Sequence, residues 1–423
     1  MSLFTYFKFE DDTNPKIKIA AWLSFIAAFG ISGWIAMATN FSVEELNFSA
    51  FDMGIVWSVK ELSVIFGFII SILLGYISES RLQGVLVALA GTAVILTGFS
   101  GTEIFLIKPL YNILNPDNIL AVNMAFLAFI VSITYNYFES SRDSLIKHST
   151  DSQITAVFLG KITAYSLAGT ALGYFLISIV GFFSFDYSYI VYYSILGFPL
   201  IVAGVMGTSK ATATKSFKDN VELIIRGKFF NFYILTFFTS SMNLIMVLFG
   251  IFLLVKRYNL SLGYIGLIFL THSALTFFFR HKAVEIMKAK GEDFTMKIRY
   301  GVTFLFFIFI AFMPMITEWE YTGFIILALL AVYGITTLFD NSIKSFISYF
   351  ATQNEQRSNL LIYTRLNQFS KIIIPVLAGW LWINYEPYSV FSLGAVFSAI
   401  CLLVSFKIYS AYKDDGSNEG EEE

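Results

Sequence analysis

The chain has 423 residues, of which 57% are hydrophobic and only 14% are charged. Soluble domains carry about 25% charged residues, so this composition excludes an ordinary soluble protein. The net charge of −2 excludes the basic character of a nucleic-acid-binding domain, and the single cysteine, Cys401, excludes an intrachain disulfide.

Apolar runs follow one another along the whole chain. A membrane-spanning helix needs about 20 mostly apolar residues, whereas barrel strands alternate polar and apolar residues. The runs here are continuous, so the sequence predicts an all-α polytopic membrane protein with twelve transmembrane helices. Their ranges are 19–38, 53–78, 84–103, 119–138, 155–183, 189–207, 229–255, 262–280, 300–317, 322–343, 359–383 and 388–406.

The longest polar interruption, "TSKATATKSFKDNVELIIRGK", divides these helices into six and six. Lysine and arginine favour the cytoplasmic side of a membrane protein. With both termini in the cytoplasm, the loops on the opposite side hold only Lys108, Lys256 and Arg257. The predicted parts are a cytoplasmic N-terminal segment 1–18, a six-helix bundle 19–207, a cytoplasmic loop 208–228, a second bundle 229–406 and an acidic tail 407–423. The first segment lacks the pattern of a cleaved signal peptide.

Internal repeats support this division. "NFSAFDMG", from Asn47, leads into the second predicted helix, and "NLSLGYIG", from Asn259, leads into the eighth. "ESSRDSLI" and "DNSIKSFI" then occupy matching places at the ends of the fourth and tenth helices. Together these matches predict two pseudo-symmetric bundles.

Basic residues occur inside the predicted spans, where a charge costs about 2.5–3.5 kcal/mol on insertion scales. Lys60, His272 and Lys371 lie roughly 10–18 Å from the starts of their helices, which is near the middle of the membrane. Small and polar residues share their helical faces, among them Thr364 and Asn367 beside Lys371. We therefore expect these five residues to bind a substrate. As an alternative, each basic residue pairs with an acid that holds two helices together.

Glu61 follows Lys60 directly, and on a helical wheel it points about 100° away from it. We expect Glu61 to pack against a neighbouring helix or to reach the outer surface. Three titratable residues are candidates for carrying a coupling proton: Glu61, His272 and Asp340. Lys161 and Arg365 lie close enough to the cytoplasmic face for their side chains to reach it.

The sequence resembles the major facilitator superfamily over essentially its full length. The resemblance rests on the six-plus-six helices, the long central loop and "GYISESR" after the second helix, with Gly75, Glu79 and Arg81. The chain departs from the family motif at Leu82 and Gln83. "ESSRDSLIKHS" and "EQRSNLLIYTR" resemble the family's charged segments after the fourth helix and before the eleventh.

The resemblance implies that the second, fifth, eighth and eleventh helices line a central cavity between two bundles. It also implies a gate of charged residues at the cytoplasmic ends of the helices. The gate residues are Gly75, Glu79, Arg81, Glu139, Arg142, Lys161, Asp340, Arg357 and Arg365.

These inferences predict a secondary transporter, not an enzyme, that moves a small organic and preferably anionic solute by alternating access. The family resemblance adds proton coupling, a monomeric state and a bacterial inner membrane as expectations. No cofactor or metal site is expected, and the other partners are membrane lipids. Two alternatives stay open: proton-driven efflux of amphipathic drug-like compounds or siderophores, and a transporter-like sensor that binds without translocating.

Overall fold

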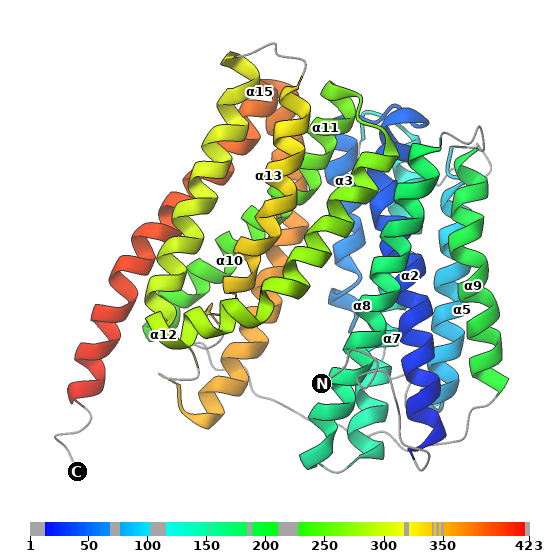
Figure 1. Cartoon of the computed structure of the whole chain (residues 1–423), viewed down its shortest axis with the longest axis horizontal. Helices are drawn as coiled ribbons and strands as arrows, with labels where there is room; N and C mark the ends of the chain where they lie inside the picture. The colour runs from blue at the N-terminus through cyan, green and yellow to red at the C-terminus, as the bar shows by residue number, and fades with distance from the viewer. Residues whose placement is uncertain are drawn as a thin grey trace. The chain divides into compact units, whose positions relative to one another are not determined.

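The computed structural model describes residues 13–67, 77–101, 116–150, 152–183, 188–209, 227–316, 321–340, 342–343, 347 and 351–418. In these ranges the regular elements are helices, and no strand is among them (Figure 1). The helices of the first part are α2 (Pro15–Glu44), α3 (Ala50–Leu62), η1 (Ile65–Gly67), α5 (Glu79–Thr97), α7 (Leu120–Ser149), α8 (Ser152–Phe182) and α9 (Tyr189–Ser209). Those of the second part are η3 (Gly227–Phe229), α10 (Phe230–Leu244), the π-helical η4 (Ile245–Phe249), α11 (Gly250–Tyr258), α12 (Leu262–Ile316), α13 (Thr322–Thr337), η5 (Leu338–Asp340) and α15 (Gln353–Asn418). Within these ranges, nine helices are long and apolar enough to cross a membrane.

Polar residues and glycine set the helix ends. α2 begins with Pro15 in its first turn, and the Asn14 side chain accepts a hydrogen bond of 3.0 Å from the backbone N–H of Lys16, as a helix cap does. After α2 and after α11, the chain turns through Asn47 and Asn259, which have left-handed φ values of 54° and 50°. These are the first residues of the two copies of the Asn-x-Ser repeat, so the motif turns the backbone in the same way in both places.

Two helices are longer than the predicted spans because each contains a break. α12 covers the predicted spans 262–280 and 300–317 and stays helical until Gly291, whose φ of 83° favours glycine. The predicted loop between these spans was therefore too long. Its first part, "HKAVEIMKAK", consists largely of good helix formers, so the helix continues through it and breaks only at Gly291, the next residue. α15 breaks at Tyr385 and Glu386, directly before Pro387, because proline disfavours a helical residue in front of it.

The predicted helix 53–78 was wrong at residues 63–67, and residues 68–76 lie outside the described part of the chain. α3 ends at Leu62, and the chain tightens through a turn into η1. The buried Ser63 hydroxyl bonds to Ser132 at 2.8 Å and accepts from Asn136 at 3.0 Å, so tertiary contacts replace the expected helical continuation. The predicted face of small residues beyond Lys60 is thus interrupted at this turn, and Gly75 lies outside the described residues.

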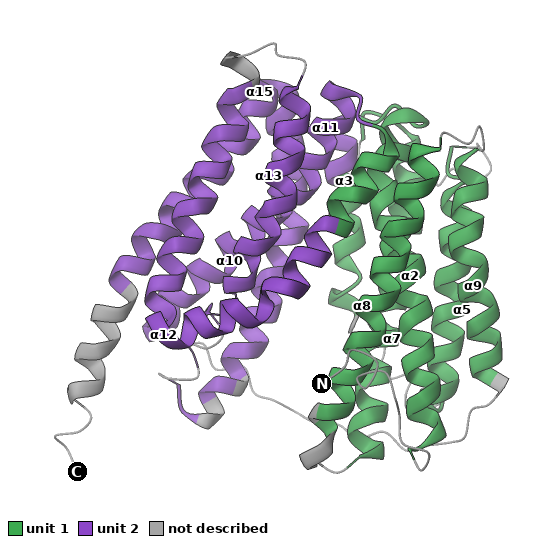
Figure 2. Cartoon of the chain, viewed as in Figure 1, with its two compact units in different colours: residues 1–48, 55–219, 261–270 green, residues 49–54, 220–260, 271–423 purple. Residues whose placement is uncertain are grey.

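The chain forms two compact units (Figure 2). Unit 1 comprises residues 1–48, 55–219 and 261–270, and unit 2 comprises 49–54, 220–260 and 271–423. Both α3 and α12 therefore contribute residues to each unit. Within unit 1, α5 packs against α7 and α9, and α2 packs against α8; within unit 2, α10 packs against α15.

Small residues bring the helices of unit 1 close together. On α8, a Cβ atom added to Gly169 would strike the carbonyl oxygen of Phe25 in α2, and one added to Gly173 would lie 2.5 Å from that of Phe29. Such close approach is typical of Gly-xxx-Gly faces in membrane helices. The Gly-xxx-Gly spacing of Gly169 and Gly173 in the sequence predicts a close helix contact, and the structure confirms it.

Candidate functional site

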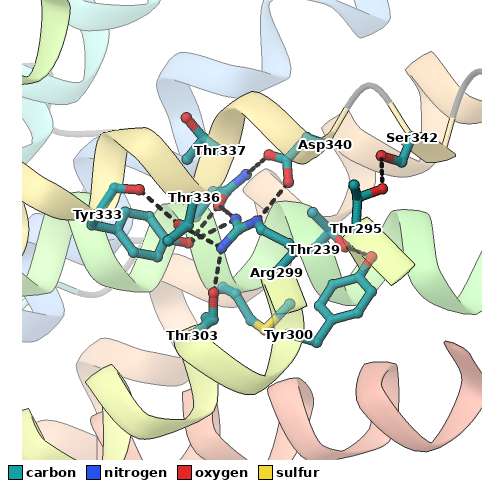
Figure 3. A network of polar contacts seen from close by, with 12 residues as sticks. Thr239, Thr295, Arg299, Tyr300, Thr303, Tyr333, Thr336, Thr337, Asp340 and Ser342 are labelled. Atoms are coloured by element: carbon teal, nitrogen blue, oxygen red, sulfur yellow. Dashed lines mark hydrogen bonds and ion pairs between the residues drawn. The ribbon is translucent and has the colours of Figure 1, made fainter. Parts of the chain in front are cut away.

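A buried arginine organises the polar interior of unit 2 (Figure 3). Arg299, on the second half of α12, has a side chain that is only 1% exposed. Its Nε donates to Asp340 at 2.8 Å, and its two Nη atoms donate to side chains of α10, α12 and α13. These acceptors are the Thr303 hydroxyl, Thr336 at 2.8 Å, Asn243 at 2.7 Å and Tyr333 at 3.1 Å. We call Arg299, Asp340, Asn243, Tyr333, Thr303 and Thr336 the Arg299 network.

All five N–H donors of the Arg299 guanidinium are used in this network. The network therefore has no donor left on Arg299 for an anionic ligand. Asp340 receives a second bond, 2.8 Å from the Asn243 amide, and its side chain is 19% exposed. Asp340 is the more accessible end of a charge-balanced pair, and Arg299 is the buried end.

The network borders a local departure from α-helical geometry. Asn243 is the penultimate residue of α10, and the five-residue π-helix Ile245–Phe249 follows directly. Single π-helical turns inside α-helices occur frequently at functional sites. This position combines a buried charge pair with an irregular backbone, so it is the first candidate for a functional centre in unit 2.

The sequence analysis missed Arg299. It placed this residue in a cytoplasmic loop, because the apolar run was read as beginning at Tyr300. Asp340 could have pointed to it, because an acidic residue inside a predicted membrane span needs a basic partner. Its partner comes from a different helix, 41 residues away in the chain.

α10 and the first half of α15 lie side by side and run in the same direction. Their contacts advance together along both helices: Lys228 with Glu355, Tyr233 with Asn359, and the Ser240 hydroxyl with the Asn367 carbonyl at 3.0 Å. Asn243 lies about one turn beyond Ser240, and Lys371 lies one turn beyond Asn367. The two helices therefore place Asn243 and Lys371 at a similar level.

Lys371 has no acidic partner among the described residues. It is half-buried, about 13 residues or 20 Å from both ends of the helical stretch 358–384, too deep for its side chain to reach either interface. Asn367 is half-buried, and its backbone carbonyl accepts the hydrogen bond from the Ser240 hydroxyl. Thr364 is exposed, and its hydroxyl donates to the Leu360 carbonyl.

His272 also belongs to unit 2. Its imidazole packs against Gly334 of α13 so closely that a Cβ atom there would lie 2.8 Å from the ring. Gly334 precedes Asp340 by six residues, or about 9 Å of helix. Three predicted site residues, His272, Asp340 and Lys371, are thus held by the helices of one unit.

The orientation predicted for Glu61 was wrong. The Lys60 ammonium lies 2.7 Å from the Glu61 carboxylate, and both side chains are largely buried, with 14% and 12% exposed. The ammonium also lies 4.6 Å from the centre of the Trp57 ring, a cation–π contact. Both residues have long side chains that bend toward each other, which the helical wheel does not show. Lys60 belongs to unit 1, and its charge is balanced locally.

The predicted gate residues fall into several local groups. Glu79, 1% exposed, lies 3.0 Å from His148 and accepts a hydrogen bond from Ser144. Arg142 pairs with Asp143 at 2.8 Å and with Glu139 at 3.5 Å. Among the remaining gate residues, Arg81 and Arg365 are exposed, and the Lys161 ammonium lies 5.9 Å from the centre of the Phe158 ring. Asp340 belongs to the Arg299 network. Gly75 and the Arg357 side chain lie outside the described part of the chain.

A further buried acid, Glu355, begins α15 and supports a prediction about pH. Its carboxylate lies 3.1 Å from the Lys228 ammonium and accepts from the Thr352 backbone N–H at 3.0 Å. Burial alone would raise its pKa, but these two partners outweigh burial and hold the pKa of Glu355 below its ordinary 4.5. A carboxyl group with a lowered pKa stabilises the folded state above its ordinary pKa, and this contribution is lost as the pH falls through the lowered value.

We therefore expect Glu355→Gln to reduce the free energy of unfolding by a constant amount at pH 5–7, and by a shrinking amount below about pH 4.5. Thermal unfolding in detergent from pH 7 to pH 3 measures this difference. The exposed Glu285 serves as a control, because Glu285→Gln should have little effect throughout. A Glu355→Gln effect that already disappears above pH 5 would contradict the assignment.

Within the described ranges, no three histidine, cysteine or acidic residues are grouped as a metal site would require. The charged groups of interest are instead the Arg299–Asp340 pair and Lys371, which has no acidic partner among the described residues and lies at about the level of Asn243 on the adjacent helix. Such an arrangement can bind polar and anionic groups, and it shows no catalytic constellation.

Several solved structures resemble this chain, although no protein-family model and no curated protein matches its sequence. A mutant of the nucleoside transporter NupG aligns with a TM-score of 0.72 at 13% identity, over 94% of this chain and 100% of that one. A bacterial homologue of the iron transporter ferroportin gives 0.70 at 11% identity, over 96% and 100%. A bacterial homologue of the human lysosomal transporter Spinster gives 0.64 at 10% identity, over 96% and 99%. The chain therefore shares its fold with these solved structures, and its apolar helices are those of an integral membrane protein.

Proposed function

We propose that this protein is a secondary transporter that moves a small organic solute, preferably an anion, across the membrane by alternating access. The fold supports transport, because the similar structures are named as a nucleoside transporter and as bacterial homologues of an iron transporter and of a lysosomal transporter. The fold does not identify the solute. The charge preference comes from the residues of this chain.

Lys371 carries the proposal. An ammonium group in the middle of a membrane helix, without an acidic partner in the described structure, is stable only where water or an anion compensates for its lost hydration. Lys60, by contrast, already has Glu61 as its counter-ion. Lys371 is therefore the residue we assign to the anionic group of the solute, with His272, which belongs to the same unit, as a second candidate.

We expect Lys371→Gln to abolish transport in reconstituted vesicles while the protein still folds, and Lys371→Arg to retain part of it. The solute is first chosen by a thermal-shift screen of anionic, neutral and cationic metabolites, because a ligand stabilises the folded state in proportion to its occupancy. Lys407→Gln is the matched control, since it removes an exposed positive charge from the same helix outside the predicted gate. Unchanged flux in Lys371→Gln would contradict the proposed role.

The same vesicles test the remaining parts of the proposal. Flux distinguishes a transporter from a sensor, and a pH gradient of either sign distinguishes uptake from export and reveals proton coupling. Glu61, His272 and Asp340 are the proposed proton carriers, and the first and third already balance a positive charge. We also propose a monomer in a bacterial inner membrane with both termini in the cytoplasm, and a gate at the cytoplasmic ends of the helices.

A further inference from the structure

We propose that Asp340 and Asn243 form a second subsite, which binds hydroxyl or amine groups of the solute whose anionic group Lys371 holds. This inference rests on the proposed function and specifies its substrate class. The expected solute is a small organic acid that carries hydrogen-bond donors, such as a hydroxy acid or an amino acid.

The first observation is unused hydrogen-bonding capacity at the accessible end of the Arg299 network. An ionised carboxylate accepts about four hydrogen bonds. In the described structure, Asp340 accepts one from Arg299 and one from Asn243, and its side chain remains 19% exposed. The Asn243 amide has a second N–H beyond the one it donates to Asp340. The carboxylate can therefore accept hydroxyl or amine donors, and the amide can donate one bond in return.

Charge balance determines which groups fit this subsite. Arg299 neutralises Asp340, and all five of its donors are already used. The subsite thus offers acceptors without a strong net charge and has no free guanidinium donor for a carboxylate. An anionic group is expected to bind at Lys371 instead, so the two subsites bind different ends of one molecule.

The second observation is the direction in which α15 presents its polar residues. Tyr363, Asn367 and Lys371 follow at intervals of four and share one helical face. Tyr363 packs against Phe232 of α10, with the ring centroids 6.1 Å apart, and the Ser240 hydroxyl of α10 donates to the Asn367 carbonyl at 3.0 Å. The face that carries Lys371 is therefore turned toward α10, and these contacts place Asn243 of α10 level with Lys371.

The backbone beside Asn243 gives a third indication. The π-helix that begins at Ile245 widens the helix immediately after the proposed subsite. π-helical turns are rare, and those inside α-helices occur frequently at functional sites. Among the described residues, Arg299 is the only arginine that lies within a buried network linking three helices. The π-helix directly follows the part of α10 that belongs to this network.

Three six-carbon acids test the proposal: hexanoate, which has no donors, and gluconate and 6-aminohexanoate, which have hydroxyl or amine donors. The readout is the half-saturating concentration in a thermal-shift titration of the purified protein. One or two additional hydrogen bonds should make gluconate and 6-aminohexanoate bind about tenfold more tightly than hexanoate. Equal half-saturation by the three acids in the wild type would overturn the proposal.

The double variant Arg299→Met/Asp340→Asn removes the carboxylate and keeps the network neutral. We expect it to bind hexanoate as the wild type does and to lose the tenfold preference for the other two acids. A preserved preference would overturn the subsite.

Lys371→Gln addresses the proposed function separately, because it should weaken the binding of all three acids. Unchanged binding in this variant would contradict the anion site but not the preference for donors. If none of the acids stabilises the wild type, both proposals fail.

Discussion

Replacing Arg299 with methionine is expected to destabilise the protein severely, by about 3–5 kcal/mol. The change leaves the Asp340 carboxylate inside unit 2 without its counter-ion and leaves the Tyr333 and Thr336 hydroxyl oxygens without the donor that Arg299 supplies. An uncompensated buried charge costs more than the original pair contributed. Thermal unfolding in detergent and the yield of monodisperse protein measure the loss.

The double variant Arg299→Met/Asp340→Asn should recover most of this stability, because both charges are removed together. Arg280→Met is the matched control on the same helix: Arg280 is exposed, and its loss should change stability by less than about 0.5 kcal/mol. The account of the network would be wrong if the double variant were as unstable as the single one, or if Arg299→Met behaved like Arg280→Met.

Adding one methyl group at Gly169 is expected to disrupt the packing of unit 1. The new Cβ atom would strike the backbone carbonyl of Phe25, which cannot rotate aside as a flexible side chain could. α2 and α8 would have to separate, and overpacking of this kind typically costs about 1–3 kcal/mol or more. We expect Gly169→Ala to lower the unfolding temperature clearly.

Gly160→Ala on the same helix provides the opposite expectation. Nothing lies within 4 Å of a Cβ atom at this position, so the substitution meets no obstacle and gains the higher helix propensity of alanine, up to about 1 kcal/mol. Its unfolding temperature should stay the same or rise slightly. Equal responses of the two variants would show that helix propensity, and not the contact with α2, determines the role of Gly169.

Hydropathy and the glycine pattern predicted much of the fold. The apolar runs gave an all-helical membrane protein, and Gly169 and Gly173 indicated a close helix contact that the structure contains. The end of α3 at Leu62 could not be predicted, since it depends on Ser63 bonding to Ser132 and Asn136, far away in the chain. The number of membrane crossings and the symmetry of the two halves stay predictions.

The candidate site was only partly predictable for a related reason. Intramembrane charge marked Lys371, His272 and Asp340, because a charge in an apolar run is visible in the sequence alone. Arg299 lies at the edge of such a run, and its importance arises only from its neighbours on other helices. The pairing of Lys60 with Glu61 depends on the reach of two flexible side chains, which helical periodicity does not include.

The most direct test of the anion site is a calorimetric titration of the acid that stabilises the wild type most. Purified wild type, Lys371→Gln and Lys407→Gln are compared under the same conditions. If the Lys371 ammonium, which has no acidic partner in the described structure and lies midway along the helical stretch 358–384, holds the charged end of the solute, Kd should rise by about 10- to 100-fold in Lys371→Gln and stay unchanged in Lys407→Gln, where an exposed charge is removed. The same Kd in Lys371→Gln and the wild type would contradict this assignment.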